Sequence, residues 1–183
     1  RTKSAKMQRA LLLLLCLLPL RAQAFAPYAS RSEFLLAPPG SLGTGLQGYA
    51  NPALLSYAQG LETTLAWSGA PASQWGVFSS FHRLGFGAVH QQETRGEGTR
   101  YHLSLGAGDR RLSTGLGYGW STGGQAQLWV LGGLLRPRPQ LSLGGVLAAS
   151  PSLRSRELSG DLSLRPWGDE RLTLFADGAR ANG

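Results

Sequence analysis

The chain has 183 residues, with 18 Lys and Arg against 10 Asp and Glu, a single Cys and 26 Gly. A mean hydropathy of −0.11 without a long apolar run excludes a bundle of membrane-spanning helices. It does not exclude a β-barrel, in which only alternate residues face lipid. The basic residues form no stripe interleaved with aromatic residues, so the net charge of +8 does not indicate nucleic-acid binding.

Residues 1–24 are predicted to be a signal peptide with an upstream extension. Positive charge precedes an apolar run at 10–20, which is shorter than the ~20 residues that a helix needs to span a bilayer. Ala22 and Ala24 give the small-x-small pattern that signal peptidase requires, so cleavage is expected before Phe25. The sequence therefore predicts export through the Sec route.

Removing the signal peptide changes the charge and the chemistry that remain. Five of the 18 basic residues lie before residue 25, which leaves 13 against 10 acidic residues, a net charge of +3. Cys16 is also in that segment, so the mature chain can form no disulfide and no Cys-based metal site. We expect no cofactor, no metal and no nucleic-acid partner.

Residues 25–60 differ in composition from the rest of the chain. They are rich in Gly and Pro and are predicted to form an N-terminal segment that enters a barrel or plugs it. A short helix is predicted at 52–58, because Asn51 is a good N-cap residue and Pro52 suits the first helical position.

From residue 61 onward, large apolar residues alternate with Gly, Ser and other small or polar residues. Strand side chains point to opposite faces with period two, so each segment has one apolar face and one small, polar face. We expect an all-β fold, an antiparallel up-and-down meander that forms part of a transmembrane β-barrel over residues 61–183. The predicted strands are 61–68, 75–82, 84–92, 100–108, 111–120, 125–135, 139–149, 156–165 and 170–177.

The connections between these strands follow a second pattern. The odd-numbered connections are the longer ones, and the even-numbered ones are mostly tight and contain Arg. Antiparallel strands place all odd connections at one rim, and outer-membrane barrels have short periplasmic turns. We therefore predict that the even turns and the N-terminal segment lie on the periplasmic side.

Aromatic residues cluster near the predicted strand ends. Trp67 and Trp75 flank the first connection, Tyr101 begins a strand and Trp120 ends one. This placement is typical of the interfacial girdles of membrane barrels, although Trp129 falls mid-strand and does not fit. The alternative interpretation is that these rings cap the core of a soluble β-sandwich.

Three charged residues share one face of a predicted strand. Glu157, Asp161 and Arg165 recur at four-residue spacing. In a barrel they could pair or line a polar path through the lumen. On a soluble sheet they would be ordinary solvent-facing charges.

The sequence contains no recognisable catalytic constellation. No Gly-x-Ser-x-Gly turn accompanies the histidines, which are interpreted as rim or lumen residues, although His90 and His102 could meet at a surface metal site. The Gly-rich run 115–119 follows strand periodicity and precedes no helix, so it is interpreted as strand rather than as a phosphate loop. We therefore expect that this chain is not an enzyme.

The stretch GTGLQGYANPALL at residues 43–55 resembles the start of FadL-like and PorV-like outer-membrane barrels. Asn51, Pro52, Ala53 and Leu54 match the family's short Asn-Pro-Ala motif, with Leu54 where the family often has Gly. The resemblance covers residues 40 to 178. It implies that the segment before the first strand packs at or inside the mouth of the barrel.

Residues 165–177, RPWGDERLTLFAD, are similar to a hairpin in barrel-like regions that precede a protease domain of the signal peptide peptidase A family. This resemblance implies that a protease domain could follow Gly183. Such enzymes use a Ser–Lys dyad, and no Lys follows Lys6, so this chain cannot supply one. Residues 179–183 are not expected to form a closing strand, and we expect the barrel region to be truncated.

These observations together predict a non-catalytic barrel of the bacterial outer membrane with a transport, secretion-associated or anchoring role. Its expected partners are outer-membrane lipid, the barrel-assembly machinery and a hydrophobic small molecule or a secretion partner. Two alternatives remain open. One is the non-catalytic N-terminal region of a signal-peptide-peptidase-like serine protease, and the other is a secreted, soluble β-sandwich.

Overall fold

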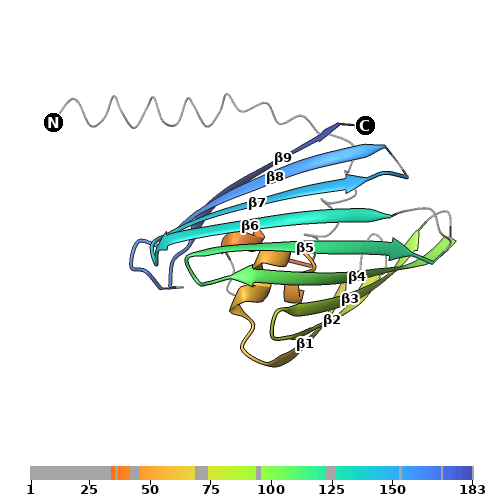
Figure 1. Ribbon diagram of the computed structural model, residues 1–183, viewed down its shortest axis with the longest axis horizontal. Coiled ribbons are helices and arrows are strands. Elements are labelled where there is room, and N and C mark those ends of the chain that lie inside the picture. The colour runs from red at the N-terminus through yellow and green to blue at the C-terminus, as the bar shows by residue number, and fades with distance from the viewer. Residues whose placement is uncertain are drawn as a thin grey trace.

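In the computed structural model, nine antiparallel strands form one sheet in which each strand pairs with the next along the chain (Figure 1). The structure describes residues 34–35, 37–41, 46–68, 74–93, 96–122, 127–152, 154–169 and 171–182. The strands are β1 (Leu61–Ser68), β2 (Gln74–Phe81), β3 (Leu84–Glu93), β4 (Gly96–Gly108), β5 (Leu112–Ser121), β6 (Leu128–Arg138), β7 (Leu141–Ser150), β8 (Ser155–Leu164) and β9 (Leu174–Asn182). The predicted all-β meander is confirmed.

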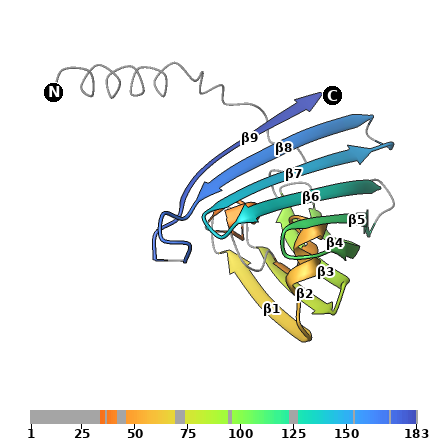
Figure 2. The same ribbon diagram turned by 60° about the vertical axis from the view of Figure 1, so that its left-hand side comes forward.

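The sheet is strongly curved (Figure 2). Its two faces carry different side chains. The period of two places most of the large apolar residues on the convex face, where they are exposed. The concave face carries Gly, Ser and a smaller number of apolar residues. The exposed large apolar residues of the convex face are Leu61, Leu65, Trp67, Trp75, Phe81, Leu84, Phe86, Leu103, Leu105, Leu112, Leu116, Trp120, Trp129, Leu131, Leu135, Leu143, Leu147, Leu158, Leu162, Leu164 and Leu174.

Three short 3₁₀ helices lie on the concave side of the sheet (Figure 2). They are η2 (Pro39–Ser41), η3 (Leu46–Gly48) and η4 (Pro52–Tyr57). The first packs against β7 and β8, the second against β2 and β3, and the third against β4, β5 and β6. The described residues that precede β1 therefore cover the inner face of the sheet, and we call residues 39–41 and 46–57 the inner segment.

The sheet has two free edges. Within the described residues, β1 pairs with β2 alone and β9 pairs with β8 alone, so the sheet is an open, curved wall. In the same part of the chain, no helix has the length and apolar character needed to cross a membrane.

Two strands differ from their predicted bounds in ways that matter for the aromatic residues and for the chain end. β6 begins at Leu128, so Trp129 lies at a strand end and not mid-strand as predicted. β9 runs to Asn182, so residues 179–182 belong to a strand and do not trail behind it. The start of β6 and the end of β9 are set by backbone pairing with the preceding strand. The residue pattern within one strand does not reveal that pairing.

The predicted difference in connection length holds at six of the eight connections. It fails after β3, where the hairpin continues to the pair Glu93 and Gly96 and only residues 94–95 connect the strands. It also fails after β8, where residues 165–173 form the longest connection. This connection is folded by a left-handed Gly168 and by Asp169, whose carboxylate accepts from the Arg171 backbone N–H.

The predicted residues of the signal peptide lie outside the described residues.

The connections after β2, β4, β6 and β8 lie together at one end of the sheet, which we call the even rim. Those after β1, β3, β5 and β7 lie at the opposite end, the odd rim.

Candidate functional site

Asn51 anchors the inner segment at the centre of the concave face. Its side-chain oxygen accepts from the Ala53 backbone N–H at 3.0 Å and caps η4, as the sequence predicts. Its side-chain nitrogen donates to the Gly133 carbonyl of β6 at 3.3 Å. The helix is a 3₁₀ helix that ends at Tyr57. One fully buried amide group thus begins the helix and ties it to the sheet.

The residues of the short motif are all buried against the sheet. Pro52 and Ala53 lie against β5 and β6, and Leu54 packs with Leu134 of β6. The motif therefore marks the part of the inner segment that contacts the sheet most closely.

Glycines of the concave face leave the space that the inner segment occupies. A Cβ at Gly115 would overlap the Pro52 carbonyl carbon, and one at Gly106 would lie 2.7 Å from the Leu55 Cβ atom. By contrast, a Cβ at Gly133, on the convex face, would meet nothing within 4 Å. The inward glycines of the repeat are thus contact positions for the inner segment.

Aromatic side chains fill the concave face beside η3. The ring of Tyr49 lies 4.9 Å from that of Phe78 and 5.6 Å from that of His102, centroid to centroid. Phe78 and His102 are fully buried. This cluster fills the space over β2 and β4 with tightly packed rings.

Two arginines near the even rim hold the η2 turn. Arg136 donates to the Gly40 carbonyl at 3.1 Å and to the Ser142 hydroxyl at 3.1 Å. Arg165 donates to the Ser41 carbonyl at 2.6 Å. The Arg136 guanidinium also lies over the Tyr57 ring, 4.5 Å from its centroid.

Sequence reasoning missed the role of Arg136 because it placed this residue in a turn. The strand continues to Arg138, and residues 130, 132, 134 and 136 all face inward. Extending the alternation of β6 by one more step would have identified Arg136 as an inward side chain.

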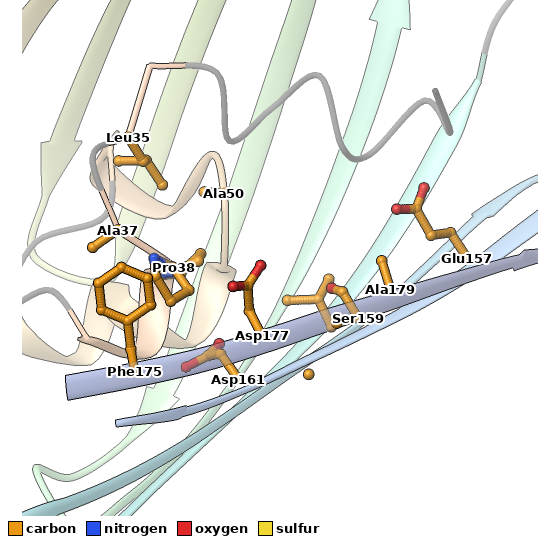
Figure 3. Close-up of a pocket in the computed structure, with 14 residues that line it drawn as sticks. Leu35, Ala37, Pro38, Ala50, Glu157, Ser159, Asp161, Phe175, Asp177 and Ala179 are labelled. Atoms are coloured by element: carbon orange, nitrogen blue, oxygen red, sulfur yellow. The ribbon is translucent and has the colours of Figure 1, made fainter. Parts of the chain in front are cut away.

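A pocket of about 300 Å³ lies between η2 and the strands β8 and β9 (Figure 3). Its wall combines the carboxylates of Glu157, Asp161 and Asp177 with apolar side chains that include Pro38 and Phe175. In Figure 3 the Asp161 and Asp177 side chains point toward the Pro38 segment. The pocket therefore offers both negative charge and apolar surface to a small molecule.

The three charged residues that the sequence places on one strand face do share the concave face. Glu157 and Asp161 line this pocket, whereas Arg165, just after β8, turns to the Ser41 carbonyl. No ion pair joins any two of the three within the described residues. Asp161 lies against Gly40 and Arg165 binds Ser41, so both contact the η2 turn.

The histidines do not converge. His90 stacks on Trp75 of the convex face with ring centroids 5.4 Å apart, whereas His102 is buried on the concave face. His82 lies in the turn after β2 with a φ of 53°. In the described part of the chain, no group of three or more His, Cys, Asp or Glu residues could hold a metal ion.

Aromatic rings form a band on the convex face near the odd rim. Trp67 is paired with Trp75 across β1 and β2, and the rings of Tyr118 and Trp129 lie 4.8 Å apart across β5 and β6. Further along the band, Tyr101 stacks on Trp120 with centroids 5.6 Å apart. The members of this aromatic band are Trp67, Trp75, His90, Tyr101, Tyr118, Trp120 and Trp129.

We expect that Asn51→Ala lowers the free energy of unfolding by about 1–2 kcal/mol, because it removes the helix cap and leaves the Gly133 carbonyl without its buried donor. Asn51→Ser is the control, since Ser keeps an oxygen for the cap and should lose less. Urea unfolding in a neutral detergent, followed by tryptophan fluorescence, measures both. Equal stability of the two variants and the unsubstituted chain would contradict the role given to Asn51.

Comparisons of the chain with protein-family models, with curated proteins and with solved structures find no match.

Proposed function

We propose that this chain forms the wall of an outer-membrane β-barrel whose N-terminal segment occupies the lumen, and that it has no catalytic activity of its own. The observation that carries the proposal is the convex face, where large apolar side chains from all nine strands are exposed. Soluble proteins rarely expose a continuous apolar surface larger than a few hundred Å². In a membrane this face would contact lipid.

The aromatic band supports the same location. Trp and Tyr rings prefer the membrane–water interface, because each has an apolar body and a polar atom. Here the band lies near one rim of the convex face, and aliphatic residues such as Leu131 and Leu147 cover the middle of the strands. This order along the strands is that of an interfacial girdle beside a lipid-facing belt.

A soluble sandwich is less well supported. It would need a second layer over the apolar face, and the described residues form a single sheet with the inner segment on its other side. The membrane proposal has its own requirement. The free edges of β1 and β9 must be paired in the bilayer, since unpaired backbone groups are costly in lipid.

Among the roles open to such a barrel, we favour transport of a small molecule. The inner segment covers the concave face, and the pocket beside it is lined by apolar groups and by the carboxylates of Asp161 and Asp177. A pocket of this size and lining suits a small amphipathic molecule better than a folded secretion partner.

Tryptophan quenching in bilayers tests the membrane location. The chain has five Trp residues, and Trp167→Phe leaves the four of the aromatic band. We expect lipids brominated near the headgroup to quench these four more strongly than lipids brominated at the chain terminus. Their quenching by aqueous iodide should be weak.

The opposite pattern would contradict the proposal. If iodide quenches the four residues and brominated lipids of either kind do not, the convex face lies outside the membrane. A folded monomer that stays in solution without detergent would argue in the same direction and would favour the soluble alternative.

A further inference from the structure

Arginines from two connections and from the end of β6 meet at the even rim, around the end of η4. They line an open pocket of about 780 Å³, distinct from the acidic pocket beside β9. The charged and aromatic side chains in its wall are Tyr57, Arg110, Arg111, Arg136, Arg138 and Arg165. None of the residues that line it is acidic.

The topology explains this convergence. In an antiparallel meander the connections after β4, β6 and β8 share one rim, so arginines far apart in sequence become neighbours. Tyr57 organises the wall at two points. Its hydroxyl donates to the Arg110 carbonyl at 2.7 Å, and its ring lies under the Arg136 guanidinium.

Within the described residues, the carboxylates of the even-rim connections, Asp109 and Asp169, form no ion pair with these arginines. Asp109 accepts from the backbone N–H groups of Leu112 and Arg111, at 2.9 and 2.7 Å, and these bonds, with a smaller effect of the nearby Arg111 charge, hold the pKa of its carboxyl below its usual range. Asp169 pairs with Arg171 at 3.1 Å, and Arg171 does not line the pocket.

Three of the lining arginines remain open to an incoming anion. Arg110, Arg111 and Arg138 are exposed, and no carboxylate of the described residues lies within ion-pair distance of them. Arg136 and Arg165 lie deeper and bind carbonyls of the inner segment. The three exposed arginines therefore supply the donors for the anion, and Arg136 and Arg165 add positive charge deeper in the pocket.

We propose that this arginine pocket binds a phosphorylated anion. The planar guanidinium fork matches the oxygens of a phosphate in pairs, and several such groups around one space suit an anion with two or more charges. An anion there would also offset the mutual repulsion of five like charges. The phosphate could belong to a soluble molecule or to a lipid headgroup, and the site does not depend on where the convex face lies.

The first test uses inorganic pyrophosphate. The full chain is titrated by calorimetry in a neutral detergent, beside the double variants Arg110→Gln/Arg138→Gln and Arg154→Gln/Arg156→Gln. The second pair is a matched control, because both of its arginines are exposed at the odd rim, away from the pocket. We expect the pocket variant to raise the Kd about tenfold or more and the control to change it less than about twofold.

The second arm identifies the source of the phosphate. Native mass spectrometry compares retention of phosphatidylglycerol with that of phosphatidylcholine in the same three proteins. The site binds a lipid headgroup if phosphatidylglycerol is retained selectively, if only the pocket variant loses this retention, and if pyrophosphate does not bind. Pyrophosphate binding without selective retention would assign it to a soluble anion.

Two outcomes would overturn the proposal. One is that neither pyrophosphate nor phosphatidylglycerol binds to a chain shown to be folded by circular dichroism. The other is that both double variants lose binding equally, since that would be a diffuse effect of net charge. Neither outcome bears on the membrane location, which the tryptophan quenching tests separately.

Discussion

Replacing Leu131 by Arg is expected to lower the free energy of unfolding in a lipid bilayer by about 2–4 kcal/mol, because a charged side chain at the bilayer midplane is costly. Leu131 lies mid-strand on the convex face, is 52% exposed, and is paired with Leu116 and Leu147 on the neighbouring strands. All three side chains would face lipid. Reversible urea unfolding in bilayers of a short-chain phosphatidylcholine measures the change.

Leu164→Arg is the matched control for this substitution. Leu164 is also an exposed leucine of the convex face, but it ends β8 at the even rim. Near the interface the expected loss falls to about 0–1 kcal/mol, because the arginine can reach water. If Leu131→Arg and Leu164→Arg cost the same small amount, the convex face faces water and the barrel proposal fails.

Gly115→Val is expected to lower the free energy of unfolding by about 1–3 kcal/mol, the usual cost of forcing extra atoms into a packed interior. The new Cβ would overlap the Pro52 carbonyl carbon, which is backbone and cannot rotate away. The inner segment should move off the sheet, so chymotrypsin should cleave at Tyr49, which is almost fully buried in the native chain. Urea unfolding and the rate of cleavage measure the two effects.

Gly133→Val provides the comparison, because it makes the same change on the opposite face. Gly133 belongs to β6 and is paired with Thr114, the neighbour of Gly115 in β5. A Cβ there meets nothing within 4 Å, and Val favours strands, so stability should be unchanged or slightly higher. Equal losses in the two variants would mean that Gly115 matters for the strand itself and not for the contact with Pro52.

The strands could be predicted because their signal is local. Alternation within residues 112–120 shows which side chains share a face, whatever lies next to them. The cap at Asn51 is local in the same way, since the atoms that bond are two residues apart. Strand ends were less predictable, because pairing with a neighbour extended β4 to Gly96 and β6 to Arg138.

The candidate sites depend on contacts between distant parts of the chain. Arg136 binds the carbonyl of Gly40, 96 residues earlier, and Arg165 binds that of Ser41, 124 residues earlier. No pattern in the sequence identifies these partners. The arginine pocket could be predicted from the sequence only in part. Its arginines are visible in the sequence near the even rim, and their convergence with Tyr57 is not.

By itself, the sequence determined the all-β class, the order of the meander and the separation of its residues into an apolar face and a small, polar face. These follow from the period of two of an extended chain and from short connections, which are properties of neighbouring residues. Only the tertiary structure decided that the small face is concave, that its glycines receive the inner segment and that two pockets of opposite charge lie beside that segment. The physical reason is that curvature and long-range packing arise from all nine strands together, so no single segment encodes them.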